Sequence, residues 1–425
     1  MQDTQPYRPM SAGSPDAPDA ATESGRRVCR ELPKVIFTVG ELYTEASGVG
    51  RIVCDLANAL GELGVPITLY TAACNGRKAA DHMMRPPSRC VAPPGISLGR
   101  LAYSPRLRRL IAEVIPQVDV VHNHCLWTLP NHYASALARR CGKPVVFTAM
   151  GFLEPWALAR SRWKKRLVGA WFQNRDLRRA ACIHVNSREE IRGIRAYGLR
   201  NPVAVIPNGV DLRHFRALPD RSAFDHRCPA GVGKRICLFL SRLHQKKGLE
   251  HLARAWGRVT KEYGDWHLVL AGPDDGYEAE MRRLVRELRL ETSVTFTGPL
   301  FGTEKLEAMA AAEAFVLPSF SEGFSMAVLE AMACGLPVVI TPGCNFPEVQ
   351  DRRAGIEVLP TVDDTERGLR ELLSMSRSEL AGIGQNARKL IESAYTWDSV
   401  ARKMLELYRW LAGGGTPPAF VEGAQ

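Results

Sequence analysis

A buried strand, a polar loop and a helix follow one another in residues 314–335, which read AFVLPSFSEGFSMAVLEAMACG. The apolar run Ala314–Leu317 predicts a strand that is covered on both faces. The helix is expected to begin near Ser325, so that Glu322 falls just before it and Glu330 within it. Free N–H groups at a helix start attract anions, and carboxylates accept hydrogen bonds from ligand hydroxyls. The segment predicts a ligand site at the carboxyl end of a strand; the alternative is a pair of incidental surface acids.

A second βα unit carries the opposite charge. Residues 240–249 read LSRLHQKKGL, in which Arg242 follows a buried strand and Lys247 opens the next helix. A guanidinium offers two parallel hydrogen bonds to phosphate oxygens, and an ammonium adds a point charge. Together they can neutralise a diphosphate. The alternative is a basic loop exposed on the surface.

Apolar runs of strand length alternate with helical stretches along the whole chain. This pattern predicts an α/β fold with parallel sheets, in two Rossmann-like doubly wound domains facing across a cleft at the carboxyl ends of their strands. The predicted strands are Val35–Val39, Ile67–Tyr70, Val118–Val121, Val145–Thr148, Ile183–Val185, Val203–Ile206, Ile236–Leu240, Leu268–Leu270, Val294–Thr297, Ala314–Leu317 and Val338–Ile340.

The domain boundary is expected within the Pro- and Gly-containing stretch Asp211–Gly233, which shows no clear periodicity. A helix near the end repeats apolar residues at helical spacing up to Leu411, and the Gly/Pro-rich residues after it predict a loose tail. The predicted parts are a disordered leader (1–33), an N-terminal acceptor domain (34–215), a C-terminal donor domain (216–395), a helix crossing back to the N-terminal domain (396–412) and a tail (413–425).

The chain has 425 residues and a net charge of +11, which is unevenly distributed. Residues 1–210 hold 29 Lys and Arg against 16 Asp and Glu, whereas the remainder holds 27 against 29. The positive excess is densest in residues 160–179, where Trp163, Trp171 and Phe172 lie among seven or more cations. A basic helix carrying aromatic residues fits an anionic membrane surface. The alternative is solvated charges around core aromatics; nucleic acid is not expected, because no recognition motif accompanies the charge.

Eleven cysteines show no Cys-x-x-Cys spacing and mostly lie in apolar runs, which is typical of reduced cysteine in a cytosolic protein. No apolar run approaches the ~20 residues that cross a bilayer, and the first residues lack the apolar core of a signal peptide. We therefore expect a cytoplasmic protein, peripheral on the inner face of the membrane if residues 160–179 bind lipid.

The chain resembles the family-4 retaining glycosyltransferases of the GT-B fold over nearly all of residues 35–411. The resemblance rests on the spacing of Glu322 and Glu330 together with Arg242 and Lys247. It extends to three further segments, namely SGVGR at 47–51, LEPWAL at 153–158 and IPNGVD at 206–211.

The resemblance implies a role for each matching residue. Arg242 and Lys247 would hold the donor diphosphate, Glu330 the ribose hydroxyls, and Glu322 the transferred sugar. Backbone and flanking contacts to the donor would come from Gly48, Gly50, Gly298, Leu300, Gly323, Phe324 and Ser325, and Glu154 is a candidate acceptor or sugar contact.

The implied reaction is a retaining transfer from a UDP- or GDP-sugar to a saccharide or lipid-linked acceptor. Two cations and a helix start can balance the charge of the leaving diphosphate, so no metal or other cofactor is expected. No Asp-x-Asp element lies beside the predicted sugar site. The alternatives are a non-catalytic protein that binds nucleotide sugars and a nucleotide-sugar epimerase on the same fold.

One position departs from the family. The usual His before Gly151 is Met150, which offers neither charge nor a strong hydrogen bond. The donor sugar could lack that contact, another histidine (His122, His124 or His244) could replace it, or activity could be reduced. His122 and His124 end a predicted strand and are expected to face the cleft, with polar loop packing as the alternative; a zinc pair is not expected, because a third ligand is missing.

Overall fold

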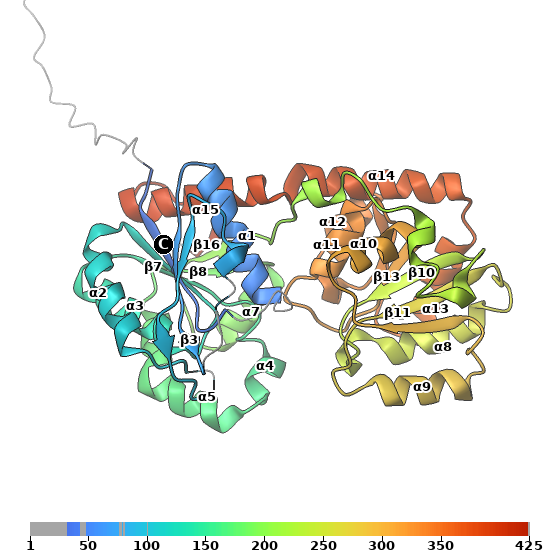
Figure 1. Ribbon diagram of the computed structural model, residues 1–425, viewed down its shortest axis with the longest axis horizontal. Coiled ribbons are helices and arrows are strands. Elements are labelled where there is room, and N and C mark those ends of the chain that lie inside the picture. The colour runs from blue at the N-terminus through green and yellow to red at the C-terminus, as the bar shows by residue number, and fades with distance from the viewer. Residues whose placement is uncertain (1–31, 43–47, 76–78, 80, 100, 424–425) are drawn as a thin grey trace, which may run out of the picture. The chain divides into compact units, whose positions relative to one another are not determined.

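The computed structural model describes residues 32–42, 48–75, 79, 81–99 and 101–423. The predicted leader lies outside these residues except for its last two positions. The described chain folds into one unit that contains two large, mainly parallel sheets with helices around them (Figure 1). A small parallel sheet of two strands, β3 (Ala73–Cys74) and β5 (Pro94–Gly95), accompanies them.

The N-terminal domain is built on an eight-stranded sheet in the order β16-β9-β8-β7-β6-β1-β2-β4, in which only β16 is antiparallel to its neighbour. Its strands are β1 (Val35–Thr38), β2 (Thr68–Tyr70), β4 (Arg89–Val91), β6 (Val120–His124), β7 (Val145–Thr148), β8 (Cys182–Val185) and β9 (Val203–Val205). Its helices are α1 (Gly48–Glu62), α2 (Pro105–Val114), α3 (Leu129–Arg140), α4 (Pro155–Ala159), α5 (Arg162–Val168), α6 (Asn174–Arg178) and α7 (Glu189–Ala196), with a π-helical turn (Gly169–Gln173) between α5 and α6.

The C-terminal domain has a six-stranded parallel sheet in the order β12-β11-β10-β13-β14-β15. Its strands are β10 (Arg235–Leu240), β11 (Trp266–Ala271), β12 (Val294–Gly298), β13 (Ala312–Leu317), β14 (Val338–Ile340) and β15 (Gly355–Glu357). Its helices are α8 (Leu249–Val259), α9 (Glu278–Glu287), α10 (Gly302–Ala311), α11 (Met326–Ala333), α12 (Glu348–Asp351), α13 (Val362–Leu373) and α14 (Arg377–Ala394).

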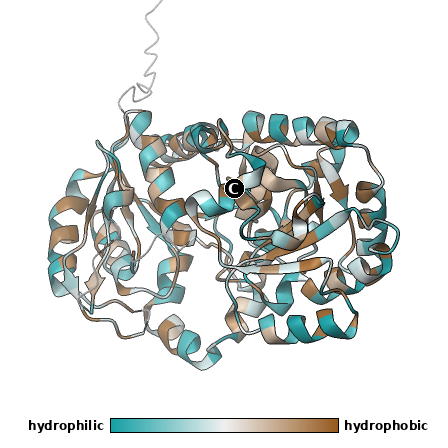
Figure 2. Ribbon diagram, turned by 45° about the vertical axis from the view of Figure 1, so that its right-hand side comes forward, coloured by the Kyte–Doolittle hydropathy of each residue, from teal (hydrophilic) through white to brown (hydrophobic). Residues whose placement is uncertain are grey.

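Both sheets reverse their strand order once, between β1 and β6 and between β10 and β13. Ligands of open α/β sheets bind outside the carboxyl ends of the strands at such a reversal. The prediction of two doubly wound domains is therefore confirmed. The hydrophobic residues concentrate in the strands, and the outer helices are largely hydrophilic (Figure 2).

The strands that the sequence did not predict lie at sheet edges. Arg89–Val91 and Gly355–Glu357 are three residues long and only partly apolar, so they lack the continuous hydrophobic run of a central strand. The stretch 211–233 contains three short 3₁₀ helices, and its Phe215 and Phe224 are buried in the C-terminal core.

The end of the chain returns to the N-terminal domain. Helix α15 (Trp397–Gly413) packs against α1, and Tyr408 is buried in the core of that domain (Figure 1). Beyond α15, β16 (Val421–Glu422) pairs with β9. The prediction of a loose tail is therefore wrong for 421–422, since the hydrogen bonds of an open sheet edge order even a short Gly/Pro-rich segment.

Candidate active site

The loops after β10 and β13 are neighbours, because these two strands pair at the reversal of the C-terminal sheet. The first loop carries Arg242 and Lys247, and the second carries Glu322. The fold thus explains why two segments about 75 residues apart in sequence can form one site.

Lys247 and Glu322 form a two-pronged ion pair. The Lys247 Nζ atom lies 2.6 Å from Oε1 and 2.7 Å from Oε2 of Glu322. The side chains are only 9% and 12% exposed. An ammonium and a carboxylate removed from water are costly unless paired, and here each neutralises the other.

The Lys247 loop is fixed against the backbone after β13. Gly248 has φ of +71°, and a Cβ on it would lie 2.0 Å from the carbonyl oxygen of Pro318, so a glycine is required there. The carbonyl oxygen of Lys246 accepts hydrogen bonds from Phe320 N (2.9 Å) and Ser319 Oγ (3.1 Å). These contacts hold the two loops in register with each other.

Asn345 braces the backbone of the Glu322 loop. Its Nδ2 atom donates to the carbonyl oxygens of Glu322 (2.8 Å) and Gly323 (3.0 Å), and Glu322 N donates to Gly343 O (2.7 Å). Asn345 adopts φ of +63°, a left-handed conformation that asparagine tolerates. The sequence analysis missed this residue; its position just beyond β14, at the same sheet edge, is the signal that could have identified it.

Arg242 is held differently from Lys247. It forms an ion pair with Asp275, and its side chain is 54% exposed. The neighbouring Asp274 accepts hydrogen bonds from the N–H groups of Gly276, Tyr277 and Glu278, which lead into α9. Asp274 and Asp275 are therefore loop acids that bind backbone N–H groups and Arg242.

Three further predicted donor residues, Glu330, Gly298 and Leu300, belong to the C-terminal domain. Glu330 on α11 pairs with Lys305 of α10 at 2.6 Å, a partner that the sequence did not suggest. Gly298 ends β12 with φ of +73°, and its carbonyl oxygen binds Gly272 N. Leu300 is buried.

Glu322 is connected to helix α11 by Gly323, Phe324 and Ser325. Ser325 is the N-cap of α11, since its hydroxyl accepts a hydrogen bond from Val328 N. The Phe324 ring packs 4.5 Å from the ring of Phe346 and is partly buried. The predicted helix start is thus confirmed.

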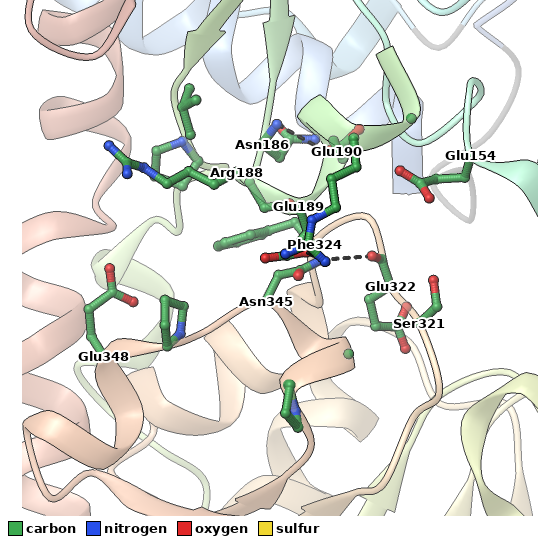
Figure 3. A pocket seen from close by; sticks show the side chains of 18 of the residues that line it. Glu154, Asn186, Arg188, Glu189, Glu190, Ser321, Glu322, Phe324, Asn345 and Glu348 are labelled. Carbon is green, nitrogen blue, oxygen red and sulfur yellow. Dashed lines mark hydrogen bonds and ion pairs between the residues drawn. The ribbon is translucent and has the colours of Figure 1, made fainter. Parts of the chain in front are cut away.

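A pocket of about 1060 Å³ opens between the two domains beside Glu322. Figure 3 shows Asn186, Glu190 and Glu154 on its N-terminal wall, opposite Ser321, Glu322, Asn345 and Glu348 on its C-terminal wall. Of the five charged residues that the sequence singled out, Glu154 and Glu322 line this pocket, whereas Arg242, Lys247 and Glu330 do not.

The turn after β7 brings the N-terminal domain into contact with the Glu322 loop. A Cβ built on Gly151 would lie 3.8 Å from the Cα atom of Gly323, so the two backbones approach closely. Trp156 of α4 makes a second contact across the domains: its ring packs edge-on against His244 at 5.7 Å, and the Lys246 ammonium lies 5.1 Å from it.

Glu154 and Met150 flank this turn. Burial raises the pKa of the Glu154 carboxyl, and the nearby Lys246 ammonium partly offsets the increase. Met150 has φ of +49°, and its sulfur lies 3.7 Å from the Cys125 sulfur. His244 accepts a hydrogen bond from Lys246 N, so it caps the short helix there.

The prediction that His122 and His124 face the cleft is wrong. His122 is fully buried, and its ring nitrogens lie 2.6 Å from the hydroxyls of Tyr408 and Thr148. His124 stacks beside it, with ring centroids 4.2 Å apart. Both project from β6 towards α15, because every second residue of a strand shares a face and this face is covered by the returning helix. The alternative of polar packing describes the two histidines better, although they pack inside the core and not in a loop.

The glycine loop is only partly described. Gly48 begins α1 and is exposed, whereas Gly50 is buried; Ser47 lies outside the described residues. Within the part of the chain that the structure describes, no three His, Cys, Asp or Glu side chains are grouped as metal ligands. The ten cysteines in these residues are all free thiols.

The two reversed parallel sheets, with a charged pocket between them, define a GT-B glycosyltransferase. The model of "Glycosyltransferase Family 4" matches residues 46–214, and that of "Glycosyl transferases group 1" matches residues 234–375. The chain belongs to glycosyltransferase family 4. This result confirms the resemblance that the two βα units indicated.

Two relatives and one solved structure illustrate the match. Alpha-maltose-1-phosphate synthase of Mycolicibacterium smegmatis is 31% identical over 68% of this chain and 78% of its own. The GDP-mannose-dependent alpha-(1-6)-phosphatidylinositol monomannoside mannosyltransferase of Mycobacterium tuberculosis is 28% identical over 85% of this chain and 92% of its own. The crystal structure of Anabaena Alr3699/HepE in complex with UDP-glucose has a TM-score of 0.67 at 19% identity, covering 88% of this chain and 98% of that one.

Proposed function

We propose that this glycosyltransferase moves a sugar from a nucleotide-diphosphate sugar to a saccharide or lipid-linked saccharide, with retention of the anomeric configuration. The observation that carries the proposal is the buried pair of Lys247 and Glu322. It combines a cation suited to a leaving phosphate with an acid suited to sugar hydroxyls, at the reversal of the donor sheet.

The chemistry follows from the charges that develop. The anomeric carbon loses its bond to the diphosphate oxygen, which takes the electron pair, and gains a bond to the acceptor oxygen on the same face. The acceptor hydroxyl proton passes to the leaving diphosphate. Lys247 and Arg242 would stabilise the growing negative charge, the largest contribution that fixed groups usually make to such a step.

No metal is required in this scheme. Two cations and the start of α11 would supply the positive charge that a divalent ion supplies elsewhere. The donor would be a UDP- or GDP-sugar; the neighbour HepE, solved with UDP-glucose, supports the first of these, and the GDP-mannose-dependent relative supports the second.

The acceptor would be delivered at an anionic membrane surface. On the helical stretch 162–178, Trp163, Leu167 and Trp171 recur every four residues and are 65%, 63% and 63% exposed. Exposed Arg162, Lys164, Arg166, Arg175, Arg178 and Arg179 surround them. Such a face combines apolar insertion with attraction to anionic lipid, about 1 kcal/mol for each cation. Helices long and apolar enough to cross a bilayer are absent from the described ranges.

A transfer assay over a panel of nucleotide sugars tests the function. A donor should raise the melting temperature, since it binds the folded state, and its sugar should appear on a saccharide or lipid-linked acceptor in the presence of EDTA. Binding without turnover would support a non-catalytic protein, and isomerised sugar an epimerase. Loss of transfer on chelation would reject the metal-independent scheme.

Vesicle sedimentation tests the membrane contact. We expect Trp163→Ser with Trp171→Ser to reduce binding to phosphatidylglycerol vesicles at least fivefold, because each indole can insert its apolar ring. Trp156→Ser, on the short helix α4, is the control for losing an exposed indole. Equal binding of wild type to neutral and anionic vesicles, or no loss in the double variant, would contradict this contact.

A further inference from the structure

Glu190 is a buried acid whose partners are backbone groups. It lies in the first turn of α7 and is 3% exposed. Its Oε2 atom accepts a hydrogen bond from Gly151 N at 2.7 Å, and its Oε1 atom accepts one from Asn186 N at 3.0 Å. One carboxylate therefore ties together the turns that follow β7 and β8.

The turn that Glu190 holds is strained. Met150 and Gly151 have φ of +49° and +71°, so two consecutive residues are left-handed, and Met150 has a side chain that disfavours this conformation. Strain of this kind persists only where the surroundings fix the backbone. The hydrogen bond from Gly151 N to Glu190 is such a restraint.

The same turn contacts the C-terminal domain beside the reacting groups. Gly151 approaches Gly323, the residue after Glu322, and both Glu190 and Glu322 line the interdomain pocket (Figure 3). A shift of this turn would change the wall that faces the transferred sugar. Misplacement by about 1 Å can reduce a rate by about 100-fold.

We propose, on the basis of the transfer reaction proposed above, that Glu190 is a positioning residue, whose carboxylate fixes the turn at Gly151 against Gly323 and thereby shapes the sugar side of the active site. It acts through backbone hydrogen bonds rather than by touching the reacting atoms.

The protonation of Glu190 affects this restraint. Burial raises the pKa of its carboxyl from 4.5 to about 7, and the hydrogen bonds from Asn186 and Gly151 oppose the rise. The charge of Glu154, in the turn before α4, raises the pKa of Glu190 further. The other charged residues of the same pocket are Arg188, Glu189, Arg192, Glu322, Glu348, Glu357 and Lys403.

Protonation converts one acceptor oxygen into a hydroxyl, so the carboxyl can no longer accept both N–H groups well. We expect the order of the turn, and with it kcat, to decrease as the pH falls below about 7. The effect on global stability has the opposite sign. Because the pKa of the folded state is raised, stability from this group is greatest below pH 4.5 and decreases as the pH rises to about 7.

The test is Glu190→Gln in the full chain, which keeps one carbonyl acceptor and removes the titration. We expect kcat to decrease about tenfold at pH 8, with the donor KM within twofold of wild type, and the decrease in kcat below pH 7 to disappear. Glu113→Gln, at an exposed glutamate of α2, is the control and should retain the wild-type profile. Circular dichroism before and after each assay verifies folding.

Failure of the role proposed for Glu190 can be distinguished from failure of the transfer function. A Gln variant with unchanged kcat would overturn the proposal, and a wild-type kcat that is flat from pH 6 to pH 8 would reject its pH dependence. If wild type neither binds nor transfers any nucleotide sugar, the transfer function itself fails, and hydrogen exchange at Gly151 N still tests the restraint. Faster exchange in the Gln variant than in Glu113→Gln supports it, and equal exchange rejects it.

Discussion

The two walls of the interdomain pocket are built in different ways. The C-terminal wall presents charged side chains on loops that Asn345 and Ser319 brace from behind. The N-terminal wall presents a backbone turn, and its acid Glu190 is used to hold that turn. In the reaction proposed above, charge for the leaving group would reside on one domain, whereas shape around the sugar would depend on the other.

The largest effect should come from breaking the buried pair of Lys247 and Glu322, of which Glu322 lies on the C-terminal wall. We expect Lys247→Ala to lower kcat/KM at least 100-fold, equivalent to about 2.7 kcal/mol of transition-state stabilisation. It should also destabilise the fold by about 3 kcal/mol, because Glu322 is left buried without its cation. Steady-state kinetics and urea unfolding measure the two effects.

Lys261→Ala, at an exposed lysine of the same domain, is the control for losing a charge and should change neither quantity. Adding Glu322→Gln to Lys247→Ala should restore part of the stability without restoring the rate. Recovery of the rate in the double variant would show that the pair is structural only.

A smaller effect is expected at the exposed cation of the same loop. Arg242→Ala should lower kcat/KM about tenfold, or about 1.4 kcal/mol, since water screens a guanidinium that is more than half exposed. The matched change is Asp275→Asn, which removes the partner of Arg242 and keeps the cation. The donor should then bind as tightly as to wild type or more tightly, as isothermal titration would measure.

If Arg242→Ala and Lys247→Ala had equal effects, burial would not distinguish the two cations. The proposed difference between the buried pair of Lys247 and the exposed pair of Arg242 would then be wrong.

The sequence predicted the C-terminal wall better than the N-terminal wall, for a physical reason. Charged residues directly after apolar strands, such as Arg242 and Glu322, must lie at the carboxyl edge of a parallel sheet, so their location follows from local pattern. The roles of Glu190 and Asn345 depend on backbone contacts between distant turns, which spacing does not reveal. His122 was misplaced because the strand pattern does not show that a helix almost 290 residues later covers that face.

The two buried histidines of β6 should affect stability and leave catalysis almost unchanged. His122→Phe removes hydrogen bonds to Tyr408 and Thr148 and should cost about 2 kcal/mol of unfolding free energy, because the Tyr408 hydroxyl loses this bond while it stays buried; the Thr148 hydroxyl keeps its contact with His184 Nδ1. His124 differs: in the described part of the chain its ring nitrogens have no hydrogen-bond partner. His124→Phe should therefore be neutral or stabilising at pH 8.

Lowering the pH should increase the difference in stability between His124→Phe and wild type. Burial lowers the pKa of His124 to about 3, whereas the unfolded chain takes up the proton near pH 6.5, so wild type loses stability as the pH falls between these values. His124→Phe removes that loss, and its advantage in urea unfolding should grow steadily from pH 6.5 towards pH 4, with kcat/KM at pH 8 within twofold of wild type. A tenfold decrease in kcat/KM for either variant, in protein that remains folded, would instead place these rings in the reaction, in the role of the histidine whose position Met150 occupies.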